Sequence, residues 1–180
     1  MKLKKILLLL LVPLIIFFTA KSYIYNTLYP LKYNEYIVCY SKKYSTDPYL
    51  IMAIIKTESK FDKNAVSQQG AIGLMQITMP TAEWIAKKTG DLDFSTNDLY
   101  DPETNIKMGV WYFNNLMEEF GNIELALAAY NAGRGNVKEW LQSPNVSKDG
   151  QTLSNIPYAE TSNYLKKVQA DERLYRFLYN

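Results

Sequence analysis

The spacing of apolar residues most constrains the fold of this chain. From about Asn34 onward, apolar residues recur every three or four positions, the period of an α-helix that is buried along one side. The alternation of apolar and polar residues between tight hairpin turns, which is typical of strands, is absent from the same part of the sequence. We therefore predict a domain that is all or mostly helical.

The ends of several predicted helices are marked by particular residues. Asp47 before Pro48 and Asp101 before Pro102 are typical N-caps followed by a proline in the first turn. Gly90 and Gly121 stand where a helix would stop. The predicted helices cover residues 34–44, 48–59, 81–89, 102–120, 123–132, 135–141 and about 159–178, with irregular connections at 62–76 and 143–156.

The first 30 residues differ in character from the rest. Three lysines, Lys2, Lys4 and Lys5, precede an uncharged run over residues 6–20. A basic start followed by an apolar run is typical of a segment that directs a chain to a membrane. Positive charges before the run predict that the N-terminus stays in the cytoplasm and that the remainder lies outside.

The length and the end of this apolar run indicate an anchor. The run of 15 residues is shorter than the roughly 20 residues that cross a bilayer, although residues 23–25 could extend it. Phe18 and Ala20 make a poor cleavage site, so we expect an uncleaved anchor, with secretion after cleavage as the alternative. The predicted organisation is a membrane segment with a spacer at 1–30 and one domain at 31–180.

The composition excludes several kinds of chemistry. The 180 residues include no His, which excludes a Ser-His-Asp triad, a Cys-His pair and His-ligated zinc. Cys39 is the single cysteine, so it can form neither an internal disulfide nor a thiolate cluster, and we expect it to be a small buried residue on the first helix of the domain. No metal and no cofactor are expected.

The charge of the predicted domain argues against nucleic acid as a partner. Four lysines and no acidic residue lie in residues 1–30, which leaves 16 basic and 18 acidic residues in residues 31–180. A domain that binds nucleic acid is expected to carry an excess of basic residues. The net charge of −2 on the domain removes the main support for that function.

Glu58 is the first candidate for acid–base chemistry. It follows the nearly continuous apolar run 50–55 at the end of a predicted helix. Apolar neighbours disfavour the charged form of a carboxyl, which keeps a glutamic acid protonated for use as a general acid. The alternative is an exposed Glu58 paired with Lys56 or Lys63. The loop that follows contains small and polar residues that can approach a ligand closely.

Four motifs follow one another along the chain. They are 58–61 (ESKF) with 65–77 (AVSQQGAIGLMQI) and 81–82 (TA), then Asp101-Pro102 with Asn105-Ile106 and Gly109, then 126–133 (ALAAYNAG), and last Ile156-Pro157 with Glu160-Thr161 and Tyr164. Together and in this order they resemble the soluble-type (SLT) lytic transglycosylases, which are lysozyme-like enzymes that cleave the glycan strands of peptidoglycan. The resemblance covers about residues 35 to 178, and four ordered motifs are far more specific than one.

The resemblance implies the fold and the roles of individual residues. The implied fold is the all-α domain of the lysozyme-like (α+β) superfamily with a catalytic cleft, and Glu58 occupies the position of the catalytic acid and base. Ser67 matches the residue that helps to hold the N-acetyl group, Gln76 one that contacts the glycan, and Tyr130 the one that closes on the catalytic carboxyl. Glu160 matches a supporting acid. The implied substrate-binding residues are Ser67, Gln76, Tyr130, Asn131, Glu160 and Tyr164.

One segment departs from the family pattern. Thr78 stands where many members have Met, and Pro80 comes one position later than usual. This departure bears on the shape of one sugar subsite and leaves Glu58 untouched.

The resemblance also implies the reaction. One carboxyl, Glu58, acts first as acid and then as base, the N-acetyl carbonyl of the substrate assists, and the product is a 1,6-anhydro-MurNAc end. Such an enzyme acts on peptidoglycan at the outer face of the bacterial membrane, without metal or cofactor, and we expect a monomer. The alternatives are a hydrolytic muramidase of the goose-type lysozyme kind and a non-catalytic protein that binds peptidoglycan.

The aromatic residues of the helices are expected in the core. Trp84, Trp111, Tyr112, Phe113 and Trp140 lie at helical spacing, where aromatic side chains are more often core residues than platforms for sugars. Tyr130 has an alternative of its own, a buried tyrosine whose hydroxyl finds a partner within the protein.

Overall fold

A computed structural model describes the backbone of residues 2–91 and 93–180, and the side chains from residue 11 onward except at 92. The chain divides into two compact units, Met1–Lys32 and Tyr33–Asn180.

The N-terminal unit is helical along most of its length. Helix α1, Lys2–Tyr23, continues into a short π-helical segment η1, Ile24–Leu28. The stretch Leu11–Leu28 has 18 residues with a mean hydropathy of 1.3, and none of it is buried within the protein. By length and composition this helix could cross a membrane.

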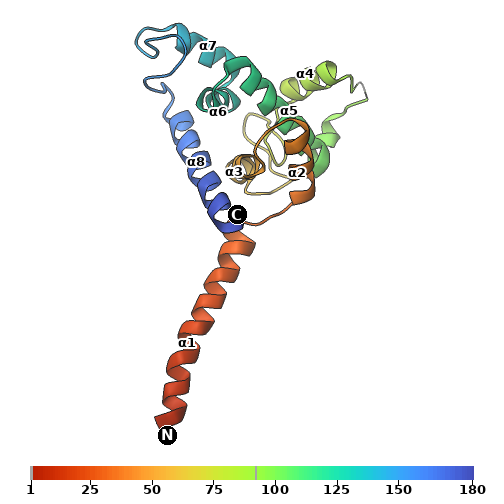
Figure 1. Cartoon of the computed structure of the whole chain (residues 1–180). Coiled ribbons are helices and arrows are strands. Elements are labelled where there is room, and N and C mark those ends of the chain that lie inside the picture. The colour runs from red at the N-terminus through yellow and green to blue at the C-terminus, as the bar shows by residue number, and fades with distance from the viewer. Residues whose placement is uncertain (1, 92) are drawn as a thin grey trace. The chain divides into compact units, whose positions relative to one another are not determined.

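The second unit consists of helices joined by loops (Figure 1). The described residues include no strand, only the isolated bridges Val66–Ile72 and Ile72–Ile77, so the prediction of an all-helical domain is confirmed. The elements are α2 Asn34–Lys43, α3 Pro48–Ser59, α4 Met79–Thr89, the 3-10 helix η2 Thr96–Tyr100, α5 Pro102–Phe120, α6 Ile123–Ala132, α7 Arg134–Gln142 and α8 Ala159–Tyr179.

The predicted helix ends agree closely with the structure. Asp47 accepts a hydrogen bond from the backbone N–H of Tyr49 at 2.8 Å, and Asp101 accepts one from that of Thr104 at 2.9 Å. Helix α4 begins two residues earlier than predicted, at Met79, because Pro80 is tolerated within a first turn. The segment η2 lies outside the predicted helices.

Helix α3 lies at the centre of the domain. Figure 1 shows it end-on, with α2, α5, α6 and α8 around it, and it packs most extensively against α8. The six residues from Leu50 to Ile55 are each at most 3% exposed, so the helix is apolar on all sides and must lie inside. Full burial of one such aliphatic side chain is worth about 1.5–3 kcal/mol. Because this part of α3 is fixed in the core, the position of its last turn, which is only partly buried, is fixed as well.

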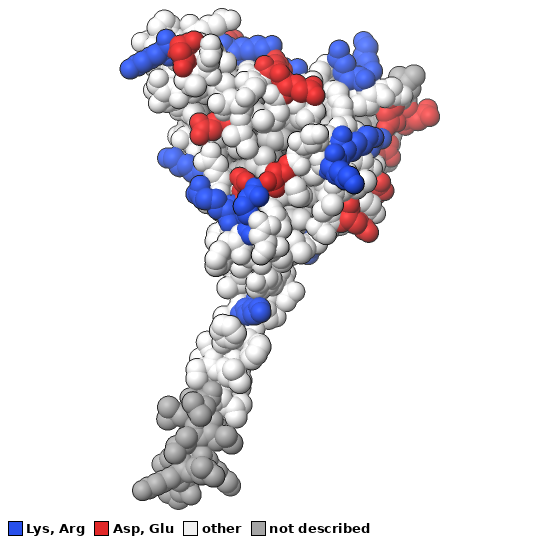
Figure 2. Space-filling view, in the orientation of Figure 1, with Lys and Arg blue, Asp and Glu red and all other residues white. Residues whose placement is uncertain are grey.

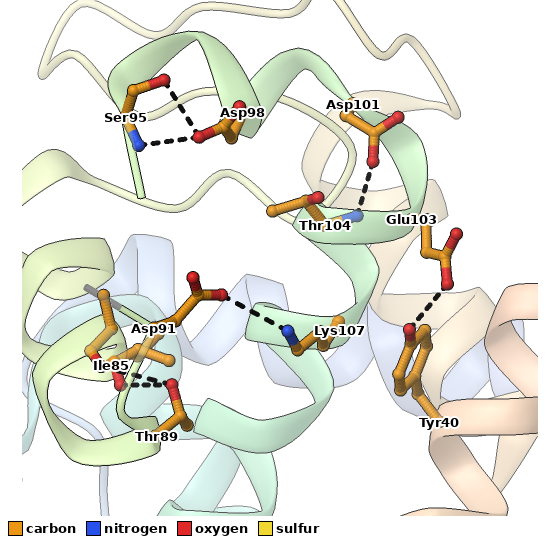
Figure 3. A network of polar contacts seen from close by, with 11 residues as sticks. Tyr40, Ile85, Thr89, Asp91, Ser95, Asp98, Asp101, Glu103, Thr104 and Lys107 are labelled. Carbon is orange, nitrogen blue, oxygen red and sulfur yellow. Dashed lines mark hydrogen bonds and ion pairs between the residues drawn. The ribbon is translucent and has the colours of Figure 1, made fainter. Parts of the chain in front are cut away.

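Polar contacts fasten the N-terminal half of α5 to its neighbours (Figure 3). Glu103 accepts a hydrogen bond from the Tyr40 hydroxyl of α2 at 2.8 Å, and Lys107 forms an ion pair with Asp91 after α4 at 3.4 Å. These contacts lie at the surface and each contributes little to stability. Together they join α5 to elements on both of its sides.

The prediction for Cys39 is wrong, because its side chain is exposed. Helix α2 buries the face that carries Ile37 and Ser41, which are 0% and 1% exposed, against the rest of the domain. Residues two positions apart on a helix are separated by roughly 200° around its axis, so Cys39 faces away from Ile37. Its apolar character did not determine its place.

Candidate active site

Glu58 lies in the last turn of the buried helix α3, and its side chain is half-buried. The helix ends at Lys60 in a left-handed conformation with φ of 53°. Next to Glu58, the Ser59 hydroxyl donates to the carbonyl of Leu74 at 2.8 Å. The end of α3 is therefore tied to the loop 62–76 that follows it.

The surroundings of Glu58 raise the pKa of its carboxyl toward neutral pH. Burial raises the pKa of Glu58 from 4.5 to about 7, while the Tyr164 hydroxyl and the Lys167 ammonium lower it and Glu160 raises it slightly further. The alternative partner Lys56 instead forms an ion pair with Asp171 at 2.7 Å. The prediction of a desolvated carboxyl at this position is confirmed.

One buried side chain, Asn105 of α5, holds the loop 62–76 in place. Its Oδ1 accepts from the N–H of Met75 at 2.8 Å, and its Nδ2 donates to the carbonyls of Ile72 at 3.0 Å and Leu99 at 2.8 Å. Asn105 is 0% exposed. Sequence reasoning placed it in a motif but gave it no role. The available signal was a polar residue beside Ile106 on the buried face of a helix.

Two glycines allow this loop to approach α5. A Cβ on Gly73, where φ is +80°, would collide with the Asn105 side chain and with the carbonyl of Leu99. A Cβ on Gly109 of α5 would collide with the Met75 side chain. Larger residues at either position would push the loop away from the helix.

The side chains of Ser67 and Gln76 both form hydrogen bonds within the loop, and each keeps one donor or acceptor available for a ligand. The Ser67 hydroxyl oxygen accepts from the N–H of Ala71 at 3.0 Å, which leaves its own proton to donate. The Gln76 amide nitrogen donates to the carbonyls of Ala65 at 3.1 Å and Gly73 at 2.9 Å. Both of its donors are thereby occupied, and the amide oxygen remains as an acceptor.

Tyr130, near the end of α6, contacts the loop through its hydroxyl. The hydroxyl donates to the carbonyl of Met75 at 2.7 Å and forms no hydrogen bond with Glu58. Burial raises the pKa of Tyr130 well above its ordinary value, and the nearby Glu58 carboxylate raises it further. Tyr130 is therefore a half-buried tyrosine whose hydroxyl has a partner within the protein, and it lies within electrostatic range of Glu58.

Helix α8 presents three polar side chains to Glu58 along one face. Glu160, Tyr164 and Lys167 are spaced four and three residues apart, which places them on the same side of the helix. Glu160 and Lys167 are exposed, whereas Tyr164 is 7% exposed. Asn131 at the end of α6 accepts a hydrogen bond from the Thr161 hydroxyl at 2.7 Å and so joins α6 to the start of α8.

The Tyr164 hydroxyl is unusual among the buried polar groups. It is close enough to Glu58 to lower the pKa of that carboxyl, yet it makes no hydrogen bond of standard geometry within the described part of the chain. Burial and then the Glu58 carboxylate raise the pKa of Tyr164. The Glu58 carboxyl is therefore the group that this buried hydroxyl faces within the protein.

Two adjoining cavities lie beside this cluster. The first, about 290 Å³, is lined by Gln76, Tyr130 and Asn131, and also by Thr78, the position that departs from the pattern. The second, about 410 Å³, is lined in part by Trp84, Tyr112 and Arg134. The two cavities share the residues Thr81, Tyr112 and Gly133 and therefore form one groove.

The groove gathers some of the predicted site residues and not others. Gln76, Tyr130 and Asn131 line it, and Tyr130 links it electrostatically to Glu58, which lies with Glu160 and Tyr164. Ser67 belongs to the same loop as Gln76 and does not line either cavity.

The aromatic prediction is right for two residues and wrong for three. Phe113 and Trp140 are buried at 1% and 7% exposure. Trp84, Trp111 and Tyr112 are only half-buried, and Trp84 and Tyr112 line the groove. Helical spacing does not separate a core position from a groove wall, because both lie on the inner side of a helix.

The described residues contain no group of three or more His, Cys, Asp or Glu side chains arranged to hold a metal ion. Of the acidic residues, Glu160 is the one that influences the Glu58 carboxyl.

Comparisons with curated proteins identify relatives of this chain. It is 36% identical over 152 residues to the soluble lytic murein transglycosylase of Escherichia coli K12, which covers 83% of this chain and 24% of the relative. It is 32% identical over 165 residues to a putative soluble lytic murein transglycosylase of Haemophilus influenzae, covering 89% and 28%. The chain thus spans about a quarter of the length of these relatives.

Solved structures of lytic transglycosylases have the same fold. The 70 kDa soluble lytic transglycosylase of Escherichia coli matches with a TM-score of 0.73 at 34% identity, over 83% of this chain and 25% of that one. An inactive Glu-to-Gln mutant of the lytic transglycosylase Slt from Pseudomonas aeruginosa matches with a TM-score of 0.72 at 33% identity, over 82% and 24%. The lysozyme-like fold predicted for the domain is confirmed.

A family model described as the transglycosylase SLT domain matches residues 35–152. This stretch contains Glu58, the loop 62–76 and every residue that lines the groove. The chain therefore belongs to the transglycosylase SLT domain family.

Proposed function

We propose that this protein is a peptidoglycan lytic transglycosylase. It cleaves the β-1,4 bond between MurNAc and GlcNAc and leaves 1,6-anhydro-MurNAc ends. The family and the names of the relatives support this activity. The observation that carries the proposal is the half-buried Glu58, whose carboxyl has a pKa raised to about 7 and which acts on Tyr130, a residue of the groove wall.

A pKa near 7 suits one carboxyl for two successive tasks. General acids and bases work best when their pKa lies near the operating pH, because both protonation states are then accessible. Glu58 fulfils this condition through burial at the end of α3. An ordinary exposed glutamate would be almost fully ionised at neutral pH and could not serve as the acid.

The proposed reaction needs no group beyond Glu58 and the substrate. Protonated Glu58 gives its proton to the bridging oxygen as the bond from that oxygen to the anomeric carbon breaks. The carbonyl oxygen of the substrate's own N-acetyl group stabilises the positive centre that forms. The Glu58 carboxylate then takes the proton of the 6-hydroxyl of the same sugar, and that oxygen bonds to the anomeric carbon.

We assign substrate binding to the residues around Glu58 that keep polar groups available. The Ser67 proton and the Gln76 amide oxygen can hydrogen-bond a sugar, since their other groups are occupied within the loop. The Tyr164 hydroxyl has a donor to offer. Tyr130 and Asn131 supply part of the wall, and Glu160 supports Glu58 from α8.

A hydrolytic muramidase is the second candidate. The observation that favours it is that a second carboxylate, Glu160, acts electrostatically on Glu58. An inverting glycosidase needs a second carboxylate to activate water. Glu160 is far from Glu58 in sequence, yet it acts on the Glu58 carboxyl from the first turn of α8. The two candidates differ in the product, which has an anhydro end in one case and a reducing end in the other.

We further propose that residues 1–30 anchor the domain 31–180 at the outer face of the bacterial membrane, where a monomer acts on the cell wall. The apolar stretch Leu11–Leu28 and the lysines before it support this position. On the face of the domain seen in Figure 2, acidic and basic residues are interspersed, in line with a partner other than nucleic acid.

The proposal is tested by the release of soluble fragments from purified sacculi by the full chain in detergent. We expect Glu58→Gln, which keeps the shape of the side chain, to lower the rate about a hundredfold to ten-thousandfold. Glu83→Gln, an equivalent change on the exposed side of α4, is the control and should leave the rate unchanged. A Glu58→Gln protein as fast as the parent contradicts the assignment. A parent that binds sacculi and releases nothing supports the non-catalytic alternative.

A further inference from the structure

Arg134 is the charged residue among those that line the second cavity of the groove. This cavity lies where α4, α5 and the turn from α6 to α7 meet, and its volume is about 410 Å³. The guanidinium carbon of Arg134 lies 4.5 Å from the ring centroid of Trp84 and 5.5 Å from that of Tyr112. These distances are in the range of cation–π contacts, so the two rings hold the guanidinium in the cavity wall. None of these three residues belongs to the site predicted from the sequence.

Arg134 is held in place and keeps donors available. Its Nη2 donates to Asn115 Oδ1 at 3.0 Å, and its Nη1 forms an ion pair with Glu119 at 3.3 Å. A guanidinium has five N–H donors, so these contacts leave others for a ligand. The side chain is 33% exposed, and Arg134 lines the cavity.

The positive charge of Arg134 is only partly neutralised. Its acidic partner Glu119 is shared with Lys138, whose ammonium lies 2.5 Å from the other carboxylate oxygen. This group of three side chains therefore carries one net positive charge. No acidic residue of the described chain lines the cavity. Arg134 is also the first residue of α7, and a helix N-terminus adds to the preference for an anion.

The cavity shares Thr81, Tyr112 and Gly133 with the cavity lined by Gln76 and Tyr130. Glu58 lines neither cavity, and its electrostatic effect on Tyr130 connects it to the groove. A polymer bound beside Glu58 would extend into this space. In peptidoglycan the MurNAc sugars carry short peptides, and those peptides end in carboxylates. The ligand that fits an arginine beside a glycan groove is thus a carboxylate attached to the glycan.

We propose that Arg134, supported by Trp84 and Tyr112, binds a carboxylate of the peptide carried by the glycan strand. This subsite makes the enzyme prefer peptide-bearing strands over bare ones. A guanidinium and a carboxylate form paired, charge-assisted hydrogen bonds, which confer both strength and geometry. The inference rests on the proposed function, because it takes the occupant of the groove to be peptidoglycan.

The test measures the binding of three defined ligands to the full chain in detergent, with Glu58→Gln present to prevent turnover. The ligands are chitotetraose, a MurNAc-GlcNAc tetrasaccharide with its peptides, and the same tetrasaccharide after an amidase has removed them. Calorimetry gives each dissociation constant with and without Arg134→Gln. Arg173→Gln makes the same change at an exposed position of α8 and serves as the matched control.

We expect Arg134→Gln to weaken binding of the peptide-bearing ligand at least about tenfold and to leave chitotetraose unchanged. Arg134→Lys keeps the charge without the paired geometry and should fall in between. An equal loss for all three ligands would mean that Arg134 only supports the fold. An equal loss for the two MurNAc ligands would assign Arg134 to the lactyl group that both of them carry, and not to the peptide. Either result overturns the peptide subsite.

The inference and the proposed function fail in different ways. If the parent cleaves sacculi and Arg134→Gln shows no selective loss, only the peptide subsite is wrong. If the Glu58→Gln protein binds none of the three ligands and the parent releases nothing from sacculi, both are wrong. Thermal unfolding of each variant shows whether a loss of binding arises from a loss of folded protein.

Discussion

At the scale of single residues, Glu58 is half-buried, and its neighbours shift the pKa of its carboxyl in opposite directions. Burial raises its pKa, and Tyr164 with Lys167 limits that rise. The apolar run before Glu58 made desolvation possible but left open an exposed Glu58 paired with a lysine, and the motifs that follow favoured desolvation. The contacts of Tyr130 could not be predicted in the same way, because its hydroxyl binds the carbonyl of Met75, 55 residues away in the sequence. Which backbone group a buried hydroxyl meets depends on tertiary packing.

The raised pKa of Glu58 predicts how stability depends on pH. Because the folded-state pKa of about 7 lies above the ordinary 4.5, the folded protein binds more protons between these values. This contribution to stability is complete below about pH 4.5 and is lost as the pH rises through 7. We expect Glu58→Gln to be more stable than the parent at pH 8, by on the order of 1–3 kcal/mol, and the difference to shrink at pH 5.

Urea unfolding at the two pH values measures this difference. Glu83→Gln, at an exposed position, should leave the stability close to that of the parent at both. If the difference in stability between Glu58→Gln and the parent is the same at pH 5 and at pH 8, Glu58 is not desolvated in the folded chain.

Two neighbours on α8 should move the pH profile of activity in opposite directions. Lys167 lowers the pKa of Glu58, so Lys167→Gln should raise it and shift the alkaline loss of kcat/KM to higher pH. Glu160 raises the pKa of Glu58, so Glu160→Gln should shift the same limb to lower pH. The pH dependence of fragment release from sacculi gives both midpoints. Shifts in the same direction, or none, would contradict the arrangement of these charges around Glu58.

At the scale of elements, the site depends on how α5 holds the loop 62–76. The loop has almost no regular structure, and Asn105 supplies three of the hydrogen bonds that fix it. Helical periodicity predicted α3 and α5 to within a residue, because each has a long apolar face and clear caps. It could not predict the path of the loop, since that path follows from contacts between distant residues such as Met75 and Gly109.

Removing the Asn105 side chain should destabilise the domain strongly. Asn105→Ala leaves the buried N–H of Met75 and the carbonyls of Ile72 and Leu99 without partners. Each unsatisfied buried group costs about 1–3 kcal/mol, so we expect a total loss of at least about 2–4 kcal/mol in urea unfolding. Asn114→Ala, on the outer side of the same helix, removes one exposed contact with Glu118 and should cost less than about 1 kcal/mol. Similar losses for the two variants would show that Asn105 does not hold the loop.

At the scale of the whole molecule, the chain consists of two parts that differ in how they expose or bury apolar residues. The N-terminal segment is apolar and unburied, whereas the domain buries its apolar residues around α3. Composition alone separates these parts, because the charge and the apolar pattern both change near residue 30. The interior of the groove was less accessible to prediction, as the exposure of Trp84 and Tyr112 indicates.

The proposed anchor predicts where the protein is found. We expect the full chain to sediment with membranes and to resist extraction by high salt or carbonate while detergent releases it. One charge at the centre of a spanning helix costs about 2.5–3.5 kcal/mol, so Leu14→Arg combined with Phe17→Asp should move the protein to the soluble fraction. A parent protein that salt alone extracts would contradict the anchor.

We propose that Glu58 gives its proton to the bridging oxygen and takes one from the 6-hydroxyl of MurNAc, and that water takes no part. Mass spectrometry of the fragments released from sacculi by the full chain tests this claim directly. We expect 1,6-anhydro-MurNAc ends, lighter by one water than reducing ends, and about a hundredfold to ten-thousandfold slower release of them by Glu58→Gln. Reducing MurNAc ends as the main product of the parent would contradict this proposal and would identify the protein as a hydrolytic muramidase.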